Sequence, residues 1–361
     1  MMTFDAARNF VQDGASFVPA GKPLARPVRS RDGKMTYDST GAFLVGELER
    51  LDPKMHEPLA AVFWGRDIDL REDVSIGDEV SSFALLNYGS PGALGSGNGV
   101  GTGKAWLSQN TTQITNVSVD IAKMPFFLHP WAMELKYTIF ELESAATAGR
   151  PIDEMKLSGL QLKHQMDIDE QVYVGDTTLG DTGLFNKSSV TNLNTLANGA
   201  AGSPLWSNKT PAEILYDVNT ALTSTWTASA YAKFPNRVMI SPLAYSFIST
   251  QVVSAAGSIS ILKYLRENNI MTAEKGVDLD IFSSKWSAGV GAGGVLGTGG
   301  TGHDRMIVYS KDKDWVRFPM TSIQRTPLQF AGIYHFVSYY CRLGIVECVY
   351  PAGMSYWDAL S

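Results

Sequence analysis

The segment that decides the fold is Asp-Glu-Gln-Val-Tyr-Val-Gly-Asp at residues 169–176, followed by Gly-Leu-Phe-Asn at residues 183–186. Upstream of it, residues 152–174 carry apolar side chains at helical spacing over an unusually wide stripe. This pattern predicts a long helix packed on two sides. Gly175 marks its end, because glycine readily adopts the backbone angles that stop a helix. The sequence therefore predicts a long helix followed by a short polar turn.

Further helices and strands are predicted on both sides of this segment. Residues 130–149 place apolar side chains at helical spacing, with Gly149 and Pro151 at the end, so a helix is expected there. Downstream, Thr210-Pro211-Ala212-Glu213 is a capping box with proline at the first helical position. The other predicted elements are a strand at 237–240, helices at 241–248 and 261–265, and strands at 306–309, 316–318, 336–342 and 344–350. Because they lack regular β-α-β alternation, the fold class is α+β.

A long β-hairpin is predicted before the helical region. A strand-like stretch runs from Val74 towards Leu86, and residues 116–121 alternate polar and apolar side chains, which is typical of a half-buried strand. Between the two strands, glycines recur at alternate positions and lead into a lysine: Gly95, Gly97, Gly99, Gly101, Gly103 and Lys104. The pattern predicts an extended hairpin with a glycine-rich tip.

Composition argues for a folded protein and against a dedicated nucleic-acid binder. Hydrophobic residues make up 44% of the 361 residues and charged residues 18%, and the net charge is −6. Proteins that bind nucleic acid carry a basic excess, because neutralised phosphates supply most of their affinity. Residues 1–47 are predicted to be an arm that needs a partner to become ordered. Its basic side chains, interpreted as solvated or docked on an acidic neighbour rather than bound to DNA, are Lys22, Arg26, Arg29, Arg31 and Lys34.

The sequence predicts no catalytic, cofactor-binding or metal-binding residue, and hence no enzyme. Gly103-Lys104 fails as a phosphate loop, because Asn98 and Ala105 stand where a glycine and a hydroxyl residue are required. The five histidines lack metal-ligand spacing, and the acidic residues Asp167, Asp169 and Glu170 are interpreted as a solvated helix face or an intersubunit ion pair.

Cysteine usage and segment hydropathy set further expectations. Cys341 and Cys348 are poor disulfide candidates, since seven residues along one extended segment would place them on opposite faces. The N-terminus lacks the pattern of a signal peptide, and no apolar run reaches membrane-spanning length. A soluble protein without membrane association is therefore expected.

The order of these parts resembles the Hong Kong 97-type fold of tailed-bacteriophage major capsid proteins, a superfamily that includes the encapsulins. The resemblance rests on residues 169–176 and 183–186, on Arg-Val-Met-Ile-Ser-Pro-Leu-Ala-Tyr at 237–245, and on the closing segment 344–351. It covers most of the chain from about residue 45 onward. Each motif is short, so the resemblance depends on their order and spacing.

The resemblance implies a domain plan and an assembly. The plan has an N-terminal arm (1–47), an E-loop (71–120), a peripheral domain (48–70, 121–235 and 325–361) with the long spine helix, and an axial domain (236–324). The protein would form pentamers and hexamers of an icosahedral head enclosing non-specifically packaged double-stranded DNA. A separate scaffolding protein, a portal and possibly a cement protein would be its partners. It would assemble in the host cytoplasm, reside in the virion capsid and need no cofactor.

Three alternatives to a phage capsid protein remain open at this point. An encapsulin-type nanocompartment shell would have the same fold. A β-rich binding or tail structural protein is disfavoured by the long helices and by the absence of repeats, and an enzyme that uses the glycine loop is disfavoured by the failed motifs. In some capsids of this fold an E-loop lysine forms an isopeptide bond with a neighbour. Lys104 lies in the corresponding part of the loop, but with no partner asparagine identified, no crosslink is predicted.

Overall fold

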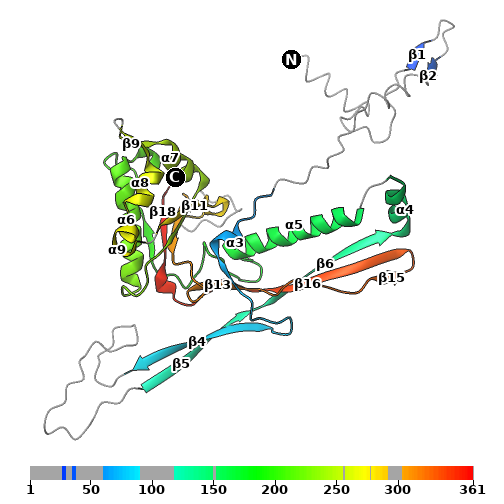
Figure 1. Cartoon of the computed structure of the whole chain (residues 1–361), viewed down its shortest axis with the longest axis horizontal. Helices are drawn as coiled ribbons and strands as arrows, with labels where there is room; N and C mark the ends of the chain where they lie inside the picture. The colour runs from blue at the N-terminus through cyan, green and yellow to red at the C-terminus, as the bar shows by residue number, and fades with distance from the viewer. Residues whose placement is uncertain are drawn as a thin grey trace, which may run out of the picture. The chain divides into compact units, whose positions relative to one another are not determined.

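The computed structural model describes residues 27–29, 35–37, 60–89, 118–148, 152–254, 257–276, 278–291 and 303–360. The chain divides into two compact units, Met1–Leu59 and Ala60–Ser361. In the first unit, strands β1 (Pro27–Arg29) and β2 (Met35–Tyr37) pair antiparallel, with Val28 opposite Thr36. All other elements of the described residues belong to the second unit (Figure 1).

The predicted long helix is confirmed as α5 (Ile152–Tyr173), and the turn after it folds back onto its last residues. The backbone N–H groups of Gly183, Leu184 and Phe185 donate to the carbonyl oxygens of Val174, Val172 and Tyr173 at 3.1, 2.8 and 3.0 Å. These carbonyls have no partner within the helix, because the last turn lacks the residues that would donate to them. Asn186 closes the turn: its side chain accepts from Gly183 N at 2.7 Å and donates to Val174 O at 2.8 Å.

Two positions in this turn require glycine. Gly175 has φ +77°, in the left-handed region, where a side chain is strained. A Cβ atom on Gly183 would lie 2.3 Å from the carbonyl carbon of Tyr173, well inside van der Waals contact. Leu184 and Phe185 lie between Gly183 and Asn186 and are fully buried in the first hydrophobic core. The glycines therefore allow the chain to approach the helix end closely and deliver two large side chains to the core.

The helix α5 lies along a long antiparallel sheet (Figure 1). The first core gathers the C-terminal residues of α5, Cys341 and Leu343 of this sheet, and side chains of a second sheet such as Met239 and Ile307. Strands β6 (His129–Thr138) and β16 (Tyr334–Leu343) pair along ten residues, and β14 (Gln324–Arg325) and β15 (Gln329–Ala331) pair with the other edge of β16. The helix predicted at 130–149 is thus wrong in its first half and confirmed as α4 (Ile139–Ala148) in its second. Residues 129–136 alternate half-buried and exposed side chains, the period of a strand, and pairing with β16 overrides the helical spacing.

The second core lies between a five-stranded mixed sheet and four helices. The strand order is β11 (Asp280–Ser283), β8 (Arg237–Ile240), β12 (Arg305–Tyr309), β18 (Met354–Asp358) and β7 (Leu193–Thr195). The β11–β8 and β18–β7 pairs are parallel, and the pairs of β12 with β8 and β18 are antiparallel. The helices are α6 (Pro211–Ala228), α7 (Pro242–Thr250), α8 (Ile261–Glu267) and α9 (Ile270–Lys275).

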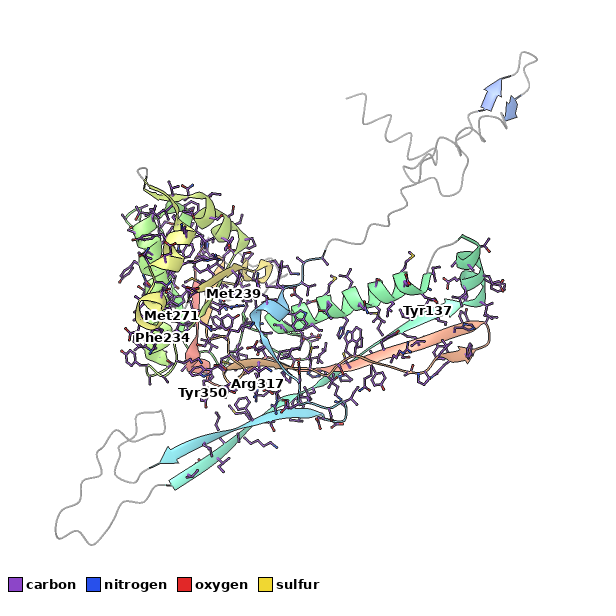
Figure 2. All side chains as sticks on the ribbon, in the orientation of Figure 1. Tyr137, Phe234, Met239, Met271, Arg317 and Tyr350 are labelled. Carbon is purple, nitrogen blue, oxygen red and sulfur yellow. The ribbon has the colours of Figure 1, made fainter. Side chains whose placement is uncertain are left out.

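Three helices of the second core, α6, α7 and α8, begin where the sequence predicted, and α9 was not predicted. The capping box at Thr210 and Glu213 is present at the start of α6, and the Ser241 hydroxyl accepts from Ala244 N at the start of α7. Met271 and Phe234, labelled in Figure 2, belong to this core, together with residues of both α6 and β8. The predicted boundary between residues 235 and 236 therefore runs through a single hydrophobic core.

Smaller elements connect the two cores. A three-stranded sheet joins β17 (Glu347–Cys348), β13 (Val316–Pro319) and β3 (Asp69–Arg71). The predicted stretches 336–342 and 344–350 are separate in the structure, and the chain turns at Gly344, where a Cβ atom would lie 2.6 Å from Pro319 Cγ. The remaining elements are α3 (Trp64–Asp67), β4 (Val80–Gly89), β5 (Ser118–Phe127), β9 (Val252–Ser254), β10 (Gly257–Ser260), and 3-10 turns at Trp206–Asn208, Lys285–Ser287 and Pro351–Gly353.

Two buried carboxylates tie α3 to both cores. Asp169, fully buried on α5, accepts from the backbone N–H groups of Phe63 and Trp64 at 2.9 and 3.2 Å, which satisfies the first donors of α3. Its other oxygen accepts from Trp286 Nε1 at 2.7 Å. The prediction that Asp169 lies on a solvated face or in an intersubunit pair is therefore wrong, because the residue is an internal cap.

The second carboxylate, Asp67, lies at the end of α3 and is also fully buried. It accepts from Arg66 Nε at 2.7 Å, from Arg237 Nη1 on β8 at 3.2 Å, and from the Tyr173 hydroxyl. Burial, and then the Asp67 charge, raise the pKa of Tyr173, so its hydroxyl stays a proton donor. The Tyr309 hydroxyl of β12 donates to the Asp67 carbonyl at 2.6 Å. One short helix thus binds the end of α5 to the central sheet.

We predict that Gly183→Ala destabilises the second unit by about 3 kcal/mol, because the added methyl group overlaps backbone atoms that cannot move independently. The measurement is the free energy of unfolding in urea. Gly159→Ala is the matched control: it lies within α5 with no atom within 4 Å of its Cβ position, and it should stabilise by about 0.5–1 kcal/mol. Equal unfolding midpoints for the two variants would contradict the role assigned to the turn.

Candidate functional site

The hairpin β4–β5 presents a largely apolar face. The two strands pair over ten residues and form a separate two-stranded sheet, which confirms both predicted arms of the hairpin. The register places Leu86 opposite Ile121 and Val80 opposite Phe127 on one face. Four of the exposed apolar side chains of this face, hereafter the hairpin face, are Val80, Leu86, Ile121 and Phe127, with exposed fractions of 41, 57, 65 and 63%. An isolated two-stranded ribbon is only marginally stable in water, so this face is suited to burial against another surface.

The base of the hairpin is fixed by a buried glutamate. Glu347 of β17 is fully buried and accepts from Arg317 Nε at 2.7 Å, from Arg71 Nη1 at 3.3 Å, and from the Ser81 hydroxyl of β4. Arg71 also donates to the Ser82 carbonyl at 3.1 Å. Arg317 is labelled in Figure 2. A buried carboxylate needs such partners, because an unpaired charge in the interior is costly.

A third arginine binds the chain on either side of the hairpin. Arg342 of β16 donates through Nε to the Ile76 carbonyl at 2.7 Å and through Nη1 to the Leu128 carbonyl at 3.2 Å. Leu128 N in turn donates to the Glu79 carbonyl at 3.0 Å. The hairpin therefore extends from a base that is bonded on both of its strands, while its apolar face stays open.

A second exposed apolar surface lies at the far end of the long sheet. Figure 1 shows α4 and β15 at the same end of α5, and the Ile139 N–H donates to the Ile333 carbonyl at 3.1 Å, which brings the two segments together. The exposed large side chains here, hereafter the distal patch, are Ile139, Phe140, Leu328, Phe330, Ile333 and Tyr334. Apolar patches of this kind mark interaction surfaces.

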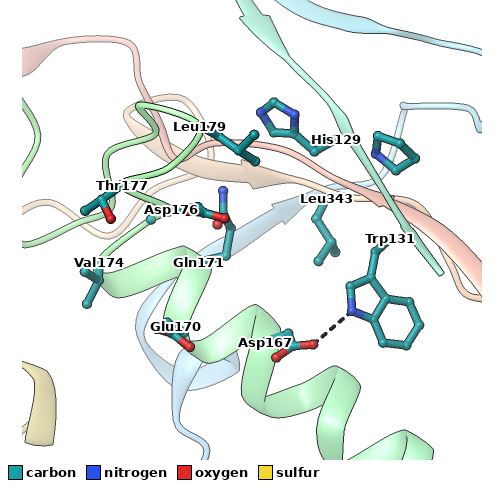
Figure 3. A pocket seen from close by; sticks show the side chains of 12 residues that line it. His129, Trp131, Asp167, Glu170, Gln171, Val174, Asp176, Thr177, Leu179 and Leu343 are labelled. Carbon is teal, nitrogen blue, oxygen red and sulfur yellow. Dashed lines mark hydrogen bonds between the residues drawn. The ribbon is translucent and has the colours of Figure 1, made fainter. Parts of the chain in front are cut away.

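A cavity of about 460 Å³ lies between the end of α5 and the start of β6 (Figure 3). Asp167 accepts from Trp131 Nε1 at 2.9 Å, and His129 Nε2 lies 3.1 Å from the Asp181 carboxylate. Glu170 also lines the cavity, and its side chain is exposed. The cavity holds polar and acidic groups but no nucleophile paired with a base.

Other titratable groups within the described residues serve structural contacts. His164 is buried against Trp131 and Cys341, and burial lowers its pKa. Cys341 and Cys348 are buried free thiols, as predicted, and burial raises the pKa of each to about 12. In the part of the chain that the structure describes, no group of three or more His, Cys, Asp or Glu could hold a metal ion. None of the described helices is long and apolar enough to cross a membrane.

All but one of the site residues predicted from sequence fall outside the described part of the chain. Gly95, Gly97, Gly99, Gly101, Gly103 and Lys104 lie in 90–117, and Lys22, Arg26, Arg31 and Lys34 flank the strands of the first unit. Arg29 ends β1, where only the backbone is described. Sequence reasoning missed Asp67 and Glu347. Glu347 is a lone acid in an apolar stretch, a pattern that solvated acids share, and Asp67 lies among other charged residues, so neither carried a signal of its own.

The fold and its surfaces define a protein with a braced interior, an exposed apolar hairpin and no catalytic constellation among the described residues. The family model "Major capsid protein" matches residues 103–360. This chain belongs to the major capsid protein family.

Solved structures show the same fold. The capsid of the Myoviridae phage XM1 matches with a TM-score of 0.67 and 14% identity, over 87% of this chain and 98% of that one. A structure of Microbacterium phage Oxtober96 matches with a TM-score of 0.55 and 10% identity, over 90% of this chain and 98% of that one. The capsid of an empty GTA particle matches with a TM-score of 0.51 and 14% identity, over 90% and 100%. No curated protein matches the chain.

We predict that Glu347→Gln destabilises the protein by about 3 kcal/mol, because it leaves Arg71 and Arg317 without their shared carboxylate. Amide hydrogen exchange at Ser81 and Ser82 should speed up along with the loss of stability. The control is Glu72→Gln. Glu72 is exposed and directly follows Arg71, and the change should alter the free energy of unfolding by no more than about 0.5 kcal/mol. Unchanged exchange at the base of the hairpin would show that Glu347 does not fix it.

Proposed function

We propose that this chain is the major capsid protein of a tailed bacteriophage, which assembles through pentamers and hexamers into an icosahedral head around packaged double-stranded DNA. The observation that carries this proposal is the β4–β5 hairpin, which is held firmly at its base while its apolar face is open. A monomer gains nothing from such a surface. A shell subunit can bury it against a second copy in every contact of a closed assembly.

The Hong Kong 97-type plan is proposed with the parts expected from sequence. The long sheet of β6 and β16, with α5 as the spine helix, would form the peripheral domain, and the β4–β5 hairpin would be the E-loop. The second core would form the axial domain. Because α6 packs into that core, we place α6 in the axial domain, earlier than the boundary expected at residue 236. The arm at 1–47 would contact neighbouring subunits.

The proposed partners follow from this role. Copies of the same chain are the main ones, and a separate scaffolding protein, a portal and possibly a cement protein complete the assembly. Packaged DNA would be contacted without sequence specificity, in keeping with the net charge of −6. The proposed location is the virion capsid, and the proposed role is structural and not enzymatic.

We predict that Ile121→Asp abolishes closed shells and leaves the subunit folded. Ile121 is 65% exposed in the single chain, so a charge there costs little until a second copy covers it, when it must be desolvated. Negative-stain microscopy and sedimentation velocity measure assembly, and the unfolding transition measures subunit stability.

Ile121→Val is the control and should assemble as the unaltered protein does. Normal shells from Ile121→Asp would show that the hairpin face is not buried on assembly. Failure of the unaltered protein to form any capsomere, shell or tube, with or without a scaffolding protein, would overturn the proposed function itself.

A further inference from the structure

Strand β6 has an outer edge that no described strand covers. Within the described residues, β6 pairs only with β16, along its whole length. In an antiparallel strand, successive residues turn their N–H and C=O groups to alternate sides. The Ile139 N–H points to the β16 side, since it donates to the Ile333 carbonyl. The even-numbered residues of β6 therefore turn their backbone groups outward.

Both ends of this outer edge are blocked by groups of the same chain. Pro130 has no N–H to offer. At the other end, Lys156 Nζ donates to the Lys136 carbonyl at 2.8 Å, and Glu141 Oε2 accepts from the Thr138 N–H at 3.1 Å. Prolines and charged side chains are the usual protection of an exposed edge. Here the middle of the β6 edge is not protected in this way. The backbone N–H and C=O groups of Ala132 and Glu134 have no partner among the described residues.

The open part of the edge has a definite length and a charged end. Residues 132–134 span about 10 Å, which is the length of a three-residue strand. Beyond Pro130 and Trp131 the edge leads into the cavity at the end of α5, which these two residues also line. There the Asp167 carboxylate already accepts from Trp131 Nε1 and pairs with Lys163, whereas the exposed Glu170 side chain makes no hydrogen bond or ion pair with described residues. A short strand with basic flanks fits both features.

We propose that the outer edge of β6 binds the basic segment 22–37 from the arm of a second copy, by strand addition at residues 132–134. This segment contains β1 and β2, each three residues long. It carries five basic side chains against one acid, Asp32. Backbone pairing supplies the affinity of such an addition, and the charges fix which segment binds. The inference rests on the proposed function, because it needs neighbouring copies.

Disulfide trapping in the full-length protein tests the contact. Glu134→Cys and Thr36→Cys variants are prepared separately, mixed under assembly conditions and oxidised. We expect at least about fivefold more disulfide-linked dimer than from Thr36→Cys mixed with Thr223→Cys, because a disulfide demands close and specific approach. Thr223 is exposed on α6, and the native thiols Cys341 and Cys348 are buried. Dimer at or below the level of the Thr223→Cys mixture would overturn the proposal.

Blocking the edge gives a second readout. Ala132→Pro removes the outward N–H without touching the pairing with β16, so the unfolding midpoint should hold while dimer in the Glu134→Cys mixture falls to the level of the control. Ala132→Val keeps the N–H and should keep the dimer. Undiminished dimer from Ala132→Pro would contradict strand addition. Shells that form without any 36–134 crosslink would refute this contact alone, whereas failure of the unaltered protein to assemble would refute the proposed function.

Discussion

The structure depends on how the C-terminal end of α5 is satisfied. A helix that ends inside a protein leaves carbonyl groups that water cannot reach. Here residues 183–185 donate to these carbonyls, and Asp169 and Tyr173 from the same helix turn bind α3. Through Asp67, α3 also bonds to β8 and β12. These strands give side chains to both hydrophobic cores, so the end of α5 is joined to the sheet that the two cores share. Both cores can then act as one rigid body.

That rigidity explains the contrast between the interior and the surface. Each buried side-chain nitrogen and oxygen among the described residues has a hydrogen-bond partner. In contrast, the hairpin face and the distal patch expose apolar side chains, and the β6 edge has backbone groups that no described strand pairs with. A shell subunit needs this division, because contacts that open and close with assembly must not disturb the fold. Glu347 and Arg342 hold the base of the hairpin, so the strands that reach a neighbour start from a fixed position.

Local signals predicted the parts that local physics determines. The end of α5 at Gly175, the capping box at Thr210 and the start of α7 at Ser241 were predicted correctly, since each depends on a few adjacent residues. Residues 130–138 were predicted as helix because only the distant partner β16 decides between the two periods. Asp169 was predicted to be solvated because its partners lie about a hundred residues away. Glycine at 95–103 and the basic residues of the arm stay predictions, since their proposed partners are other copies.

Hydrogen exchange on free subunits and on assembled shells tests the central claim most directly. The account predicts that amides of residues 172–185 are strongly protected in both states, because their bonds are internal. It also predicts that amides of the β4–β5 hairpin exchange fast in free subunits and become protected by at least about tenfold in shells, as neighbours bury the apolar face. Equal protection of the hairpin in both states would contradict the account, since the hairpin would then owe its order to its own chain and not to assembly.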